Sequence, residues 1–185
     1  AQLVAEAADD ARPAGRFDAS WHEPGAKQLL GKGSVVVNVT SGGGYNVPLM
    51  TGTMNVTDPK RYNGTVAYGF HKRAQMVLNQ YWRTTYGAIG IDFFVMHPGW
   101  ADTAGVQRSL PRFRKILKSI LRDAESGADT AIWLVAKRPS QPEEELVWFD
   151  RAVRTAHVYP HTRTTRETPQ SLVAWLEAEL GRGPR

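Results

Sequence analysis

The chain has no cysteine and only five histidines among its 185 residues. Disulfides, thiolate metal sites and a cysteine nucleophile are therefore excluded. We predict no metal site of any other kind. The lack of cysteine, together with the lack of a recognisable signal peptide, fits a reducing compartment, so we expect an intracellular, cytoplasmic protein.

Long apolar runs are also missing. The longest are interrupted by Asp92 or His97 and stay well short of the ~20 residues that span a bilayer, so no integral membrane segment is expected. The net charge is +5, but the Lys and Arg residues are scattered from Arg61 to Arg185 rather than clustered with aromatic residues. This distribution favours a solvated basic surface and predicts no nucleic-acid partner.

Hydrophobic patterning divides the chain into three parts. Residues 1–30 show neither helical nor alternating periodicity, which predicts a poorly ordered lead-in. Residues 31–181 carry the pattern of one globular domain, and 182–185 form a tail.

Within the domain, elements of α/β type alternate. A β-branched run at 34–40 predicts a strand buried on both faces, as in a parallel sheet, and it ends at Ser41 and three glycines. Apolar residues stepping by three and four predict a long helix over 65–84, and 89–96 predicts a second buried strand. A strand, helix and strand in this order imply parallel neighbours.

Further elements follow along the chain. Helices are predicted over 110–121 and 124–136, a last strand over 146–149, and a closing helix that begins at Thr168-Pro169 and ends at Gly181. The long polar segment 45–63 is predicted to be a functional flap or a mobile loop.

Tyr68 and Lys72 are four residues apart on the long helix, so both side chains lie on one face beside the apolar stripe. A neighbouring ammonium favours the phenolate form of tyrosine, which a general acid for carbonyl reduction requires. The same spacing also arises by chance on many helices.

Two more sets of residues follow the predicted buried strands. Ser41 lies where an open α/β sheet binds ligands and is able to hydrogen-bond a carbonyl, although a serine there also serves simply to end a strand. At the end of the next strand, Pro98-Gly99 lets the backbone approach a flat ligand, and Thr103 can bond an amide or phosphate. A lone histidine such as His97 is more often structural than a metal ligand or an acid/base group.

Together these residues resemble the short-chain dehydrogenase/reductase family in three ordered motifs: N-x-[ST]-S at 38–41, Y-x-x-x-K at 68–72 and P-G-x-x-x-T at 98–103. The phrase H-P-G-W-A-D-T at 97–103 and G-A-D-T at 127–130 resemble one particular branch of it. The resemblance extends over about 31–180.

The resemblance implies a function and a set of roles. It implies an NAD- or NADP-dependent oxidoreductase acting on a small carbonyl or alcohol substrate. Catalytic roles then fall to Ser41, Tyr68 and Lys72, with Tyr68 as acid or base and Lys72 also binding the nicotinamide ribose. Cofactor contacts fall to Tyr68 and Lys72 and to a second set, Pro98, Gly99, Ala101 and Thr103. Ala101 departs from the usual Val or Ile.

The sequence lacks the family's opening strand, its Gly-x-x-x-Gly-x-Gly loop and the helix whose N-H groups hold the pyrophosphate. The expected fold is therefore the C-terminal half of a doubly wound, Rossmann-like parallel sheet without the N-terminal dinucleotide-binding βαβ unit. We expect an uncovered sheet edge and poor NAD(P)H binding by this polypeptide.

Two questions stay open at this point. The chain is either a fragment of an enzyme or a non-catalytic remnant that serves as a structural or interaction module. A homodimer through the Tyr68 helix is also open, with Met76, Trp82 and Tyr86 as interface or core residues.

Overall fold

A computed structural model describes residues 3–5, 30–56, 58–102, 121–144 and 146–181. In these ranges five strands form one sheet in the order β1-β2-β3-β4-β5. β1 to β4 run parallel, and β5 returns antiparallel to β4. The strands are β1 (Leu3–Ala5), β2 (Val35–Val39), β3 (Asp92–Met96), β4 (Leu146–Phe149) and β5 (Ala152–Thr155).

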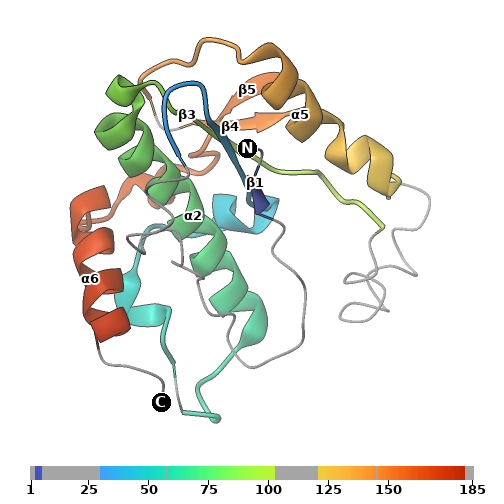
Figure 1. Ribbon diagram of the computed structural model, residues 1–185. Coiled ribbons are helices and arrows are strands. Elements are labelled where there is room, and N and C mark those ends of the chain that lie inside the picture. Colours follow the sequence, from blue (N-terminus) through green and yellow to red (C-terminus); the bar gives the residue numbers. More distant parts are fainter. Residues whose placement is uncertain (1–2, 6–29, 57, 103–120, 145, 182–185) are drawn as a thin grey trace.

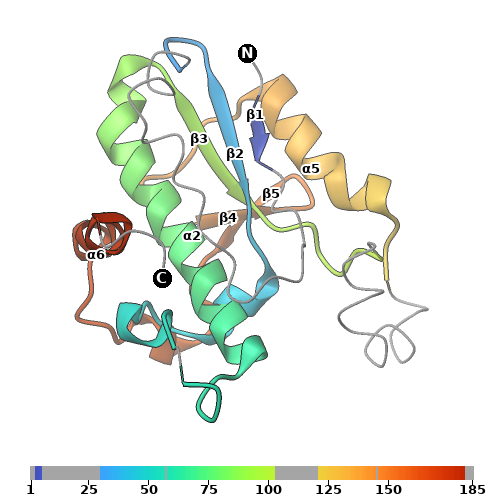
Figure 2. The ribbon, with the colours of Figure 1, turned by 60° about the horizontal axis from the view of Figure 1, so that its bottom comes forward.

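Helices cover both faces of the sheet, as Figures 1 and 2 show. α2 (Gly64–Tyr86) and α6 (Pro169–Gly181) lie together on one face, and α5 (Ala124–Lys137) lies on the other. No helix in the described ranges has the length and apolar character needed to cross a membrane.

The side chains of β3 explain why a continuous apolar run forms this strand. Phe93 packs toward α2, whereas Phe94 and Met96 pack toward Leu134 of α5. All three β3 side chains are 1% exposed. Because successive strand residues point to opposite faces, a strand covered on both sides needs apolar residues at every position.

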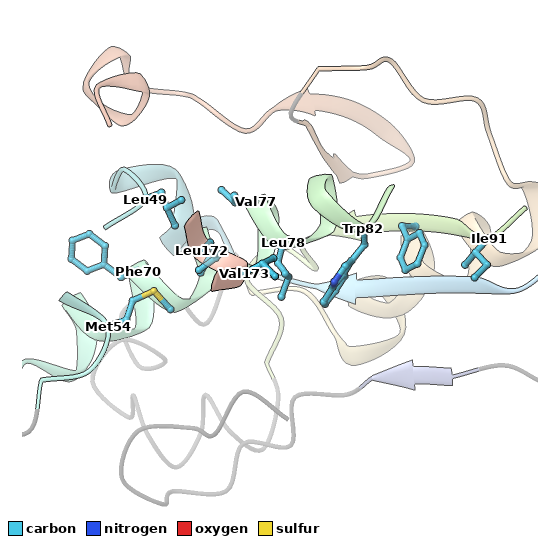
Figure 3. Close-up of a cluster of buried hydrophobic side chains, with 11 residues drawn as sticks. Leu49, Met54, Phe70, Val77, Leu78, Trp82, Ile91, Leu172 and Val173 are labelled. Carbon is cyan, nitrogen blue, oxygen red and sulfur yellow. The ribbon is translucent and has the colours of Figure 1, made fainter. Parts of the chain in front are cut away.

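The larger core cluster lies between α2, α6 and the sheet (Figure 3). Its buried members come from the apolar stripe of α2, from β3 and the residue before it, from α6 and from the segment after η2. They are Leu49, Met54, Phe70, Ala74, Val77, Leu78, Trp82, Ile91, Phe93, Leu172 and Val173. Leu49 and Met54 belong to the predicted flap, which in the structure is anchored in this core. Burial of side chains of this size contributes about 1.5–3 kcal/mol each.

Most of the predicted elements are confirmed. The two buried strands, the long helix, the 124–136 helix, the last strand and the closing helix all form, within a few residues of the predicted bounds. Thr168 caps the closing helix, since its Oγ1 accepts a hydrogen bond from Ser171 N at 3.1 Å. Met76 and Trp82 are core residues, 1% and 4% exposed. The predicted 110–121 helix lies almost wholly outside the described residues.

Several expectations were wrong. β1 lies in the segment where no strand was predicted, and it pairs with β2, so β2 is not an uncovered edge. β5 was missed, because the sequence of Ala152–Thr155 carries polar residues and does not show the pattern of a buried strand. β3 starts only at Asp92, since Gly87–Ile89 forms a 3-10 turn.

The strand ends before the three glycines, as predicted. Gly42–Asn46 forms a short 3-10 helix, η2, which packs against α2. Gly44 lies closest to that helix: a Cβ there would meet Arg73 N at 3.0 Å and Lys72 C at 3.1 Å. A side chain at Gly44 would therefore push the turn away from the backbone of α2.

We predict that Gly44→Ala destabilises the protein by about 1–3 kcal/mol, because the new methyl group overpacks a backbone contact. Gly52→Ala is the matched control, since Gly52 lies in the comparable 3-10 turn Thr51–Thr53 and has nothing within 4 Å of a Cβ. Urea unfolding of both variants measures the difference. Equal stability of the two would show that the Gly44 contact is not tight.

Candidate active site

The predicted catalytic residues come from two neighbouring elements. Ser41 lies two residues after the end of β2, whereas Tyr68 and Lys72 belong to the N-terminal half of α2. Lys72 Nζ donates a hydrogen bond to Val39 O, at the end of β2, at 3.4 Å and lies 5.5 Å from the centre of the Tyr68 ring. An ammonium, a phenol and the carboxyl end of a buried parallel strand are thus brought together.

Gly43 connects Ser41 with Tyr68. Ser41 Oγ accepts a hydrogen bond from Gly43 N at 3.3 Å, and a Cβ on Gly43 would lie 3.3 Å from Tyr68 Cε1. The hydroxyl and the phenol ring therefore adjoin the same glycine. Tyr68 is 49% exposed, so a ligand at this edge of the sheet is able to reach it.

The backbone of Lys72 is fixed from the sheet side. Thr40 is 2% exposed, and its Oγ1 donates to Lys72 O at 2.8 Å, while its backbone N donates to Met96 O at 2.7 Å. Thr40 is the third residue of the N-x-[ST]-S motif. Its hydroxyl joins α2 to the end of β2, and its backbone N joins the end of β2 to β3.

The predicted cofactor residues Pro98, Gly99 and Ala101 follow β3, and Thr103 lies outside the described residues. Gly99 has a φ of +73°, in the left-handed region that favours glycine. Ala101 is buried, and its Cβ lies 3.0 Å from where a Cβ on Gly127, in the first turn of α5, would be. The segment is thereby held against α5 at the same edge of the sheet as Ser41.

A hollow of about 290 Å³ joins the turn after β2 to the segment after β3. Its lining consists of Gly42, His97, Gly99, Trp100, Arg122 and Phe149. The ends of adjacent parallel strands are the usual ligand position in an open α/β sheet. Of the predicted site residues, Gly99 lines this hollow and Ser41 precedes its lining residue Gly42, whereas Tyr68 and Lys72 are not among the lining residues.

His97 forms one wall of the hollow. Its ring stacks on Phe149 at 4.3 Å between centroids and meets Tyr45 edge-on at 5.4 Å. Nδ1 accepts a hydrogen bond from Gly99 N at 3.2 Å, so the Nε2 atom carries the proton. Burial lowers the pKa of His97 to about 4. The structural role expected for this histidine fits the bond to Gly99.

Sequence reasoning missed an ion pair on the rim of the hollow. Arg122 donates to both carboxylate oxygens of Asp150, at 2.6 and 3.1 Å, and its guanidinium lies 5.1 Å from the Phe149 ring centre. The Arg122 hydrogen bond holds the pKa of Asp150 below its usual range. The two residues are far apart in the sequence, so no local spacing indicates the pair.

The described residues contain no group of three or more His, Asp or Glu side chains placed to hold a metal ion. The groups at this edge of the sheet are a phenol, an ammonium, a hydroxyl, the His97 imidazole, the Arg122–Asp150 ion pair and backbone amides. Such groups transfer protons and orient a polar ligand.

Comparison with known proteins found two similar curated sequences. The chain is 36% identical over 154 residues to dehydrogenase/reductase SDR family member 12 of Bos taurus, covering 80% of this chain and 46% of that protein. It is 39% identical over 124 residues to the Homo sapiens protein of the same name, covering 66% of this chain and 38% of that protein. No protein-family model matches the chain. The branch that the 97–103 phrase resembled is the one these relatives represent.

We predict that His97 makes stability depend on pH. The pKa of His97 falls from 6.5 to about 4 on folding, so the unfolded state binds the proton first as pH drops, and stability falls between about pH 6.5 and 4. Because the ring is only half-buried, we expect a loss of about 1–2 kcal/mol, less than the full shift implies.

His97→Phe keeps an aromatic ring stacked on Phe149 but removes the titrating imidazole. Its stability should therefore fall less than that of the unchanged protein between about pH 6.5 and 4. Urea unfolding at pH 7 and near pH 4 measures both proteins. An identical pH dependence in the two would contradict the assignment.

Proposed function

Because the chain belongs to the short-chain dehydrogenase/reductase family, we propose that its site serves an NAD- or NADP-dependent oxidoreductase acting on a carbonyl or alcohol. The chain spans less than half the length of the curated relatives it matches, 46% and 38% of them. The activity and the small-molecule substrate are therefore proposals for this chain. One observation carries them: Lys72 Nζ lies 5.5 Å from the Tyr68 ring centre at the end of a buried parallel strand.

The described residues fit the nicotinamide-ribose end of such a cofactor. Lys72 supplies an ammonium beside the end of β2. The left-handed Gly99 lines the hollow, where Arg122 Nε and Phe149 Cε2 each lie 3.1 Å from the position of a Cβ. Ammonium groups donate to ribose hydroxyls, and a glycine allows a flat ring to approach the backbone. When bound, the cofactor supplies or accepts the hydride.

Tyr68 is the proposed acid and base. In reduction, the substrate carbonyl gains a hydride at carbon and a proton at oxygen, and Tyr68 Oη provides that proton. In oxidation the phenolate takes the proton back from the alcohol. The ammonium of Lys72 favours the phenolate, because opposite charges at short range stabilise the ionised form.

Ser41 is the proposed orienting group for the substrate oxygen. Its Oγ accepts from Gly43 N, which leaves the hydroxyl hydrogen able to donate. A donor on the substrate oxygen polarises the carbonyl and holds it beside the phenol. Tyr68 and Ser41 adjoin Gly43, so one substrate oxygen is able to lie between them.

We predict weak NADH or NADPH binding, above micromolar dissociation constants, because the sequence lacks the Gly-rich loop that holds the pyrophosphate. Chemical shifts measured by NMR at millimolar cofactor should still change at Lys72, Tyr68 and Gly99. Lys72→Ala should abolish the changes at Tyr68. Lys137→Ala, at the far end of α5, is the matched control and should leave them intact.

Two results would contradict the proposal. No shift changes with either cofactor in a folded protein would favour a non-catalytic structural or interaction module. Shift changes at Tyr68 that survive Lys72→Ala would place the cofactor elsewhere.

A further inference from the structure

Arg73 follows Lys72 on α2 and is 1% exposed, the largest fully buried side chain of the described residues. A buried guanidinium destabilises a protein unless its charge and its N-H groups have partners. Arg73 Nη1 donates to Ala156 O at 2.7 Å, and Nη2 lies 2.7 Å from His157 Nε2 and 2.8 Å from His157 Nδ1. The side chain thus connects α2 with the segment that follows β5.

Hydrogen bonds continue from Arg73 through His157 and Thr162 to Tyr159 O. Thr162 Oγ1 donates to Tyr159 O at 2.7 Å, so toward His157 Nδ1, 2.9 Å away, it acts as the acceptor. In the tautomer with the proton on Nδ1, that nitrogen donates to Thr162 and Nε2 accepts from Arg73, so the 2.8 Å contact between Arg73 Nη2 and Nδ1 is not a hydrogen bond. Thr162 is 0% exposed. The result is a buried polar chain from α2 to residues 156–162.

Three elements hold the helical turn that carries Lys72. Thr40, after β2, donates to Lys72 O. Gly44 of η2 lies against the backbone of Lys72 and Arg73. The Arg73 guanidinium fixes the same turn to residues 156–162. Apolar packing alone would need no charge at this position, and an apolar residue would avoid the desolvation penalty.

We propose that Arg73 is a positioning residue for the candidate active site: by holding α2 to residues 156–162, it sets the placement of the Lys72 ammonium beside Tyr68. This inference rests on the proposed function, because it gives that placement a catalytic purpose. Arg73 does not touch the ligand itself. Its effect reaches the chemistry through Lys72.

The test measures the pH at which Tyr68 ionises, from the phenolate absorbance of each protein minus that of its Tyr68→Phe counterpart. Arg73→Met should raise this pH by about 1 unit, because the ammonium moves away from the phenol. Arg73→Lys, which keeps one donor for Ala156 O, should restore part of the shift.

Arg83→Met is the matched control. Arg83 lies on the same helix and likewise donates to a backbone carbonyl, Glu143 O at 2.7 Å, but it is far along α2 from Lys72. Its loss should lower stability without moving the ionisation of Tyr68. If Arg73 served stability alone, Arg73→Met would likewise lower stability without moving the ionisation of Tyr68.

A folded Arg73→Met protein with unchanged Tyr68 ionisation would overturn the inference. If Arg73→Met does not fold, Thr162→Val breaks the same hydrogen-bonded chain at its far end. This variant should raise the pH at which Tyr68 ionises by a smaller amount. An unchanged ionisation pH in Thr162→Val would also overturn the inference. Lys72→Ala in the otherwise unchanged protein separates the two claims. If it leaves Tyr68 unaffected, the proposed function fails, whatever Arg73 does.

Discussion

The contact between Gly44 and the backbone of α2 is the constraint on which the rest of the site depends. A Cβ at Gly44 would lie 2.7 Å from Met76 Cε and 3.0 Å from Arg73 N, so the turn after β2 packs tightly against α2. Because of that approach, Thr40 Oγ1 reaches Lys72 O and Lys72 Nζ reaches Val39 O. It also places Gly43, which donates to Ser41 Oγ, against the Tyr68 ring. The positions of Lys72 and Tyr68 therefore depend on this packing together with the side-chain hydrogen bonds of Thr40 and Arg73.

Rigid elements surround this contact, and a buried polar chain from Arg73 to Thr162 runs beside it. The strands beneath it carry buried apolar side chains on both faces, and the hollow lies where β2, β3 and β4 end. On its rim Arg122 is engaged by Asp150, and inside it His97 is neutral at physiological pH. The cation that faces the phenol is Lys72, which is the electrostatic arrangement that proton transfer from a tyrosine requires.

Local patterns predicted most of the fold, and the roles assigned to the site residues stay predictions. Apolar periodicity over 65–84 and the β-branched run at 34–40 suffice for α2 and β2, since both depend on neighbours in the sequence. Long-range pairing was not predictable. β5 is exposed and polar, so its pairing with β4 leaves no hydrophobic signature. The Arg73–His157 contact joins residues 84 positions apart, and nothing near Arg73 indicates that its charge is buried.

Native-state hydrogen exchange at α2, β2 and β3 tests the central claim most directly, because it reports whether the helix and the sheet open together. If main-chain packing at Gly44 fixes the site, amides from Arg73 to Leu78 should exchange with the same opening free energy as those of β2 and β3. If that part of α2 exchanges at a clearly lower free energy than the two strands, the helix detaches on its own, and the placement of Lys72 and Tyr68 does not come from this contact.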